Sequence, residues 1–237
     1  LFARWAGWFP SYLLHVWGRP GLTIPLAAVS WLPDIDTAWH GARLLSAMAT
    51  AGSALIAARL AMRMGVARAW LVVVLCYAQP LASVLATTTL TENFAGLYLV
   101  AAAALLRAKR AISGSLMFSL LLVTRHEAVA LLPVWMIGVW MAGGGRTRFI
   151  AAAFATALAP IVHNVLFFAT FGTWPFSIFS QATGSTEYLP AGPLGYVPDA
   201  LHAMTPFVLA LAIIGGAALR RRGNWLTPAL AVTFLLT

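Results

Sequence analysis

The chain has 237 residues, of which 61% are hydrophobic and only 9% are charged. Soluble domains carry about 25% charged and about 45–50% apolar residues, so the composition excludes an ordinary soluble fold. The formal net charge is +9, but the basic residues lie in short clusters between apolar blocks. The positive-inside rule accounts for that distribution, and we therefore expect no nucleic-acid partner.

The apolar residues form continuous blocks such as AWLVVVLCYAQPLASVLA, which do not alternate with polar residues. Strands of a membrane barrel would alternate, and an open sheet would leave backbone groups unpaired in lipid. We predict an all-α, polytopic transmembrane bundle in which residues 1–237 form one membrane domain. The single cysteine, Cys76, permits no internal disulfide. The chain starts without methionine and ends within an apolar run, which we interpret as the middle portion of a longer protein.

Residues 1–39 are predicted to lie at the outer surface of the membrane as an interfacial segment. They hold half of the ten tryptophans, which favour the headgroup level: Trp5, Trp8, Trp17, Trp31 and Trp39. Within this segment, HVWGRPG forms a turn that aims Arg19 outward, with His15 as a weaker candidate. A guanidinium there suits a lipid phosphate, although snorkelling to headgroups explains the residue equally well.

Asp34 and Asp36 follow in WLPDIDTAW, two residues apart and just before a helix. The pair could bind a divalent ion or act in acid–base chemistry. Capping of the helix by Asp36 or Thr37 is the alternative, and the sequence slightly favours it.

The predicted spans are set by four basic clusters, which we place on the cytoplasmic side. The clusters are Arg59, Arg63 and Arg68; Arg107, Lys109 and Arg110; Arg146 and Arg148; and Arg220, Arg221 and Arg222. About eight crossings result: residues 40–60, 70–86, 91–106, 111–124, 128–142, 149–171 and 203–219, and one that begins near 225. All six acidic residues then lie on the opposite side: Asp34, Asp36, Glu92, Glu127, Glu187 and Asp199. Residues 172–202 form an outer loop, rich in proline and glycine, that could cover a cavity.

Two outer turns carry the main candidate residues. The span 111–124 measures roughly 21 Å at 1.5 Å per residue, whereas a hydrocarbon core is about 30 Å thick. The turn with Arg125, His126 and Glu127 should therefore lie below the membrane surface. Charged groups at that depth are functional by default, but a plain loop in which Arg125 and Glu127 pair remains open. In the other turn, TTTLTENF, Thr91 is a possible N-cap, and Glu92 either favours the helix dipole or faces the same cavity.

Several motifs are absent from the sequence: a Walker A loop, G-x-G-x-x-G, C-x-x-C, H-E-x-x-H and a nucleophile elbow. The isolated His40, His163 and His202 are more typical of packed or helix-end histidines than of metal ligands. We expect no metal site and no cofactor.

The order of WGRPG, ARLLSAMATAGSALIAARLAMRMG, QPLASVLATTTLTENFAGLYL and GSLMFSLLLVTRHEAVALLPVW resembles the membrane core of GT-C-fold glycosyltransferases. This family includes protein mannosyltransferases and aminoarabinose transferases, and the resemblance covers residues 10–170. It implies transfer of a sugar from a polyprenyl-phosphate donor to a glycan, lipid or protein acceptor at the outer face of a bacterial inner membrane.

By position, the resemblance implies that Arg19 and Arg125 bind the lipid phosphate and that Glu92 and Glu127 position sugar or acceptor. The family's catalytic aspartate usually precedes the WGRPG-like turn, yet no acidic residue precedes Arg19 here. The catalytic base is therefore expected upstream of Leu1. A secondary transporter or lipid flippase that uses the same charges, and a non-catalytic assembly subunit, remain the alternatives.

Overall fold

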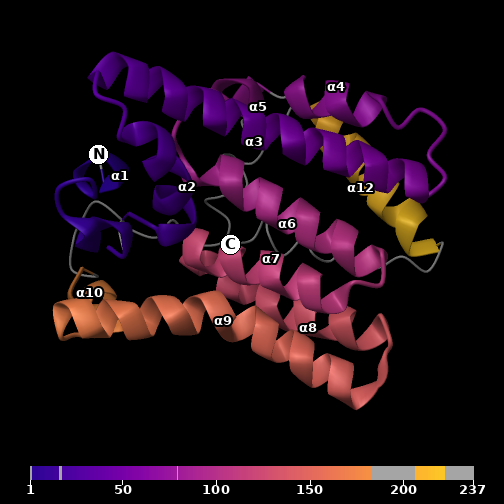
Figure 1. The fold of residues 1–237 in the computed structure, drawn as a ribbon. Coiled ribbons are helices and arrows are strands. Elements are labelled where there is room, and N and C mark those ends of the chain that lie inside the picture. Colours follow the sequence, from indigo (N-terminus) through magenta and orange to yellow (C-terminus); the bar gives the residue numbers. More distant parts are fainter. Residues whose placement is uncertain (1, 16–17, 79, 183–205, 222–237) are drawn as a thin grey trace.

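The computed structural model describes residues 2–15, 18–78, 80–182 and 206–221, and every regular element within them is helical (Figure 1). The elements are α1 (Phe2–Trp5), the 3-10 helix η1 (Pro10–Leu13), α2 (Pro20–Ser30), α3 (Ile35–Arg63), α4 (Leu71–Tyr77), α5 (Pro80–Leu85), α6 (Thr91–Arg107), α7 (Ala111–Thr124), the 3-10 helix η2 (His126–Leu131), α8 (Leu132–Met141), α9 (Gly145–Phe171), α10 (Pro175–Ala182) and α12 (Pro206–Arg221). The all-α prediction is confirmed for these residues. The span expected near 225, the loop residues Glu187 and Asp199, and His202 lie outside the described residues.

The long helices run side by side in the order α3, α6, α7 and α9 (Figure 1). Small residues allow the close approach of α3 to its neighbours, because its buried positions are Ala38, Ala42, Ser46, Ala49, Ala54 and Ala58. At Gly114 of α7, an added Cβ would lie 3.0 Å from the carbonyl oxygen of Ala102 in α6. Between α7 and α8, the rings of Phe118 and Trp135 stack with centroids 4.6 Å apart. The helices are therefore in close contact at these positions.

Two helices, α3 and α9, are long and apolar enough to cross a membrane. In the most apolar 18-residue stretch of each helix, only 28% of the residues of α3 and 22% of those of α9 are buried. Large side chains such as Phe154 and Ile161 of α9 remain exposed. A core helix of a soluble protein would be mostly buried, so the surfaces of these two helices are apolar faces left open by the fold.

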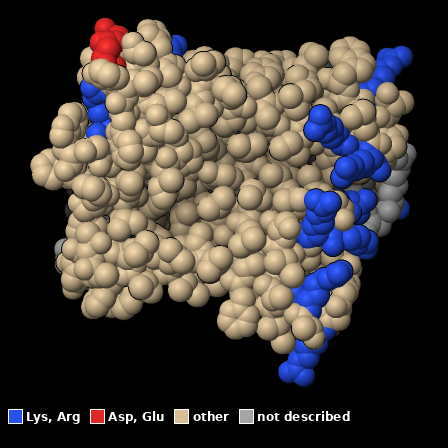
Figure 2. Space-filling model, in the orientation of Figure 1, with Lys and Arg blue, Asp and Glu red and all other residues tan. Residues whose placement is uncertain are grey.

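The charged residues divide between the two ends of the bundle. Lys and Arg gather along one edge, where α3 and α6 end and α7 and α9 begin (Figure 2). The four described acidic residues all belong to the opposite end: Asp34, Asp36, Glu92 and Glu127.

Several expected boundaries were wrong for identifiable reasons. The span expected at 40–60 begins at Ile35, because Asp34 caps the helix instead of Asp36 or Thr37 and accepts a 2.7 Å hydrogen bond from the Thr37 amide. The stretch 70–86 is divided between α4 and α5, and Pro80, the first residue of α5, lacks the amide proton that would continue α4. Within 1–39, the structure forms the eleven-residue helix α2, which the interfacial prediction did not include.

Candidate functional site

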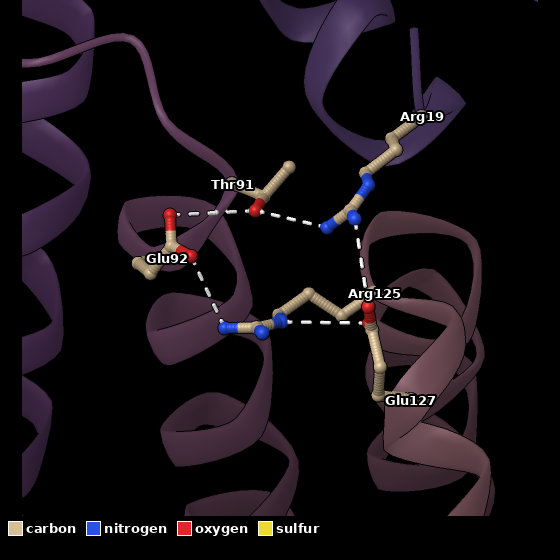
Figure 3. A network of polar contacts seen from close by, with 5 residues as sticks. All are labelled: Arg19, Thr91, Glu92, Arg125 and Glu127. Atoms are coloured by element: carbon tan, nitrogen blue, oxygen red, sulfur yellow. Dashed lines mark hydrogen bonds and ion pairs between the residues drawn. The ribbon is translucent and has the colours of Figure 1, made fainter. Parts of the chain in front are cut away.

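Four segments meet at the acidic end of the bundle: the start of α2, the start of α6, the end of α7 and η2. Arg19 is the N-cap of α2, Thr91 and Glu92 open α6, Arg125 ends α7, and Glu127 lies in η2. Side chains from distant parts of the sequence are thereby directed toward one point (Figure 3).

Local chain chemistry fixes Arg19 at the start of α2. Its φ of 55° is unusual for a residue other than glycine. The next residue, Pro20, occupies the first turn of the helix, where its fixed φ is favourable. The Thr23 hydroxyl donates to the carbonyls of Gly18 and Arg19 at 2.9 and 3.0 Å, which ties down the backbone on both sides of the turn.

Gly21 brings this turn against α6 and α7. An added Cβ would overlap the Thr124 hydroxyl and lie 2.9 Å from the carbonyl oxygen of Leu120. The Tyr98 hydroxyl of α6 donates to the Gly21 carbonyl at 3.0 Å. Only a residue without a side chain permits this approach, so Gly21 positions Arg19 beside the ends of the other two helices.

Arg125 and Glu127 owe their positions to the abrupt end of α7. At Arg125 the backbone becomes extended, with φ −134° and ψ 113°, and the 3-10 helix η2 follows. The amide of Arg125 still donates to the Leu121 carbonyl at 2.8 Å, which keeps the extended residue joined to the helix.

The five side chains close a ring of polar contacts (Figure 3). Arg125 Nη1 lies 3.1 Å from Glu92 Oε1, and Arg125 Nε lies 3.6 Å from Glu127 Oε2. Arg19 Nη2 lies 3.5 Å from Glu127 Oε1, and Arg19 Nη1 donates to Thr91 Oγ1 at 3.3 Å. Thr91 Oγ1 in turn donates to Glu92 Oε2 at 3.4 Å.

The ring is electrically neutral, because it joins two guanidinium groups and two carboxylates. Both arginine side chains are 25% exposed, whereas Glu92 is 37% and Glu127 is 43% exposed. Partly exposed pairs of this kind each contribute up to about 1 kcal/mol. The carboxylates thus form the more accessible side of the ring.

An apolar cavity of about 610 Å³ lies between α7, η2, α8, α9 and α10. His126, His163 and Asn164 are polar residues of its lining, while Leu122, Met136 and Phe176 are among the apolar ones. A second cavity of about 320 Å³ lies between α2, α7 and α9, and Val123 and His163 line both. His126, which stands between Arg125 and Glu127 in the chain, lines the larger cavity, whereas the five residues of the ring line neither cavity.

The structure brings together four of the residues selected from the sequence: Arg19, Glu92, Arg125 and Glu127. His126 is adjacent and lines the cavity. The weaker candidate His15 is not a member of the ring, although its carbonyl accepts a 3.2 Å hydrogen bond from the Arg19 amide. The ring of His15 stacks on that of Phe2 at 5.0 Å.

Asp34 and Asp36 take no part in the ring. The Asp34 carboxylate accepts hydrogen bonds from the amide and the hydroxyl of Thr37, and these bonds lower the pKa of Asp34. The cap of this helix is therefore Asp34 rather than the expected Asp36 or Thr37.

Two features of the site were missed or misassigned. Thr91 was expected to be an N-cap, but the cap position is Leu90, and the Thr91 hydroxyl instead joins Arg19 to Glu92. The sequence predicted a turn at Gly21 but not its close approach to α7. The Pro-Gly pair directly after Arg19 was the sequence feature that could have indicated it. Among the described residues, no group of three or more His, Cys, Asp or Glu is placed to hold a metal ion.

Comparisons of the chain with protein-family models, curated proteins and solved structures yield no match.

Proposed function

We propose that the ring is the donor-phosphate site of a membrane glycosyltransferase of the GT-C type. The donor is a sugar linked to a polyprenyl phosphate, and the acceptor hydroxyl belongs to a glycan, a lipid or a protein. The observation that carries this proposal is the convergence of Arg19 and Arg125 beside an apolar cavity of about 610 Å³. Guanidinium groups recognise phosphate oxygens, and an apolar groove accepts an isoprenoid chain.

We infer that the chain is embedded in a bacterial inner membrane as a polytopic bundle of about eight spans. The composition and the open apolar faces of α3 and α9 support this inference. The basic edge of the bundle would face the cytoplasm, which leaves the ring at the extracytoplasmic side.

The proposed reaction is a single displacement at the anomeric carbon of the sugar. The acceptor oxygen forms a bond to that carbon, and the bond from the carbon to the phosphate oxygen breaks with inversion. The acceptor proton passes to a general base. Negative charge grows on the departing phosphate, where Arg19 and Arg125 stabilise it more strongly than in the ground state.

The test is transfer of a radiolabelled sugar from a polyprenyl-phosphate donor by the complete gene product. Replacement of Arg125 by Ala should lower transfer by at least about a hundredfold, the loss typical of a missing group that stabilises transition-state charge. Arg107→Ala, at the opposite end of the bundle, is the matched control and should leave transfer within about twofold. Equal activity of the Arg125→Ala and wild-type proteins would remove the ring from the reaction.

A further inference from the structure

We infer that Glu127 is a built-in substitute for the phosphate of the ligand, and that binding requires this carboxylate to leave the ring. The inference rests on the phosphate site proposed above and concerns how that site is kept closed.

The geometry of Glu127 matches that of a phosphodiester. One carboxylate oxygen lies 3.5 Å from Arg19 Nη2, and the other lies 3.6 Å from Arg125 Nε. A phosphodiester also presents two equivalent oxygens that share one negative charge. It could therefore contact one arginine with each oxygen and leave the charge of the ring unchanged.

Glu127 is also the member of the ring that is most easily displaced. Its two contacts are longer than the roughly 2.7–2.9 Å of a strong charge-assisted hydrogen bond. Its side chain is 43% exposed, against 25% for each arginine. Departure of the carboxylate into solvent consequently costs little.

The two arginines stay in place when Glu127 leaves, because each has a second partner. Arg19 donates to the Thr91 hydroxyl at 3.3 Å, and Arg125 lies 3.1 Å from Glu92. Thr91 and Glu92 also contact each other. The start of α6 thus holds both guanidinium groups in position, while Glu127 occupies the gap between them.

Without Glu127 the three remaining charges sum to +1. In this state the site attracts an anion but has no internal group to neutralise it. The wild-type ring, in contrast, exchanges one anion for another and so admits only ligands that compete with the carboxylate. Glu127 therefore tunes affinity and excludes weak anions such as chloride.

The experiment measures binding of methyl farnesyl phosphate, a phosphodiester with one negative charge, to the full-length protein in phosphatidylcholine nanodiscs. Farnesol, which lacks the phosphate, reports on the apolar cavity alone. Glu127→Gln should bind the phosphodiester about threefold to tenfold more tightly than wild type, the gain expected when two partly exposed ion pairs no longer compete. Glu127→Asp keeps the charge but is too short to bridge both arginines, and should show a smaller gain.

Asp36→Asn is the matched control, since it removes one carboxylate from the same end of the bundle but outside the ring. It should change affinity less than twofold, whereas Arg19→Gln and Arg125→Gln should weaken binding at least about tenfold. Farnesol affinity should be the same in all variants.

The possible failures separate the two proposals. If Glu127→Gln binds no more tightly than wild type while both arginine variants lose affinity, the phosphate site stands and the substitute role of Glu127 is wrong. If the arginine variants bind like wild type, or if no protein shows saturable binding that depends on the phosphate, both proposals are overturned.

Discussion

The two ends of the helical bundle carry charge in different ways. At one end, Arg19 and Arg125 contact carboxylates and a hydroxyl that come from other helices. At the other end, Lys and Arg gather along one edge (Figure 2). Arg107 and Arg146 there are exposed, and no ion pair joins any of the described basic residues at that end.

The two ends place different demands on an arginine. At one end partners fix the direction of its side chain, and at the other only the side of the membrane on which it lies matters. Exposed arginines at a membrane surface need only be on the correct side, so their individual geometry matters little. Arginines held from two sides have a fixed direction, which is what recognition of a ligand requires. Under the proposed function, the same residue type therefore serves two purposes in this chain.

The sidedness of the two ends can be tested by an all-or-none experiment. With Cys76 replaced by Ser, a cysteine placed at Asp36 or at Arg146 becomes the only thiol among residues 1–237, and both positions are exposed. In intact cells, a membrane-impermeant maleimide should label Asp36→Cys and should reach Arg146→Cys only after the inner membrane is opened. Labelling of both variants in intact cells, or the reverse order, would contradict the proposed orientation.

The next largest effect is expected at Gly21, which holds the ring end together. Gly21→Ala gains helix propensity, worth up to about 1 kcal/mol, but introduces a Cβ that meets the Thr124 hydroxyl and the Leu120 carbonyl. Overpacking of this kind costs about 1–3 kcal/mol. We expect a lower thermal midpoint in detergent and weaker binding of the phosphodiester.

Gly52→Ala in α3 is the control for that substitution. There, the nearest atom to an added Cβ is a methyl carbon of Leu97 at 3.5 Å, an ordinary contact. The variant should retain or slightly raise the thermal midpoint. A similar loss in both variants would show that the close approach at Gly21 is not special.

Local signals predicted many of the helix limits. The expected helix 111–124 is found as α7 at the same residues, since basic residues precede it and Arg125, His126 and Glu127 follow it. The limits of α6 also agree to within one residue. By contrast, α2 carries no strong periodicity, and Pro25 within it argues against a helix. A tertiary contact from Tyr98 to the Gly21 carbonyl and a local hydrogen bond from the Thr23 hydroxyl to the Gly18 carbonyl stabilise it.

The composition of the site and the contact between Arg125 and Glu127 could be predicted, but the contacts that join them to Glu92 and Arg19 could not. Two hairpins have helices too short to cross a bilayer, and the charged residues of their turns are Glu92, Arg125 and Glu127. Which carboxylate meets which arginine depends on how the helices pack, and Arg19 and Thr91 are 72 residues apart. The misassignment of Thr91 has the same origin, because a hydroxyl at a helix start serves equally as a cap or as a tertiary contact.

The smallest expected effect measures how strongly the ring itself is coupled. A double-mutant cycle with Arg125→Gln and Glu92→Gln should give a coupling free energy of about 0.5–1 kcal/mol, since their contact is 3.1 Å but Glu92 is 37% exposed. The free energy of unfolding would be followed by SDS titration in mixed micelles. The corresponding cycle with Arg107→Gln and Lys109→Gln, both exposed at the basic end, should give a value near zero or slightly negative, because like charges repel. Equal coupling at the two ends would mean that the side chains of the ring interact no more strongly than solvated surface charges. The contrast between arginines held in a fixed geometry and arginines that only need to lie on one side would then disappear.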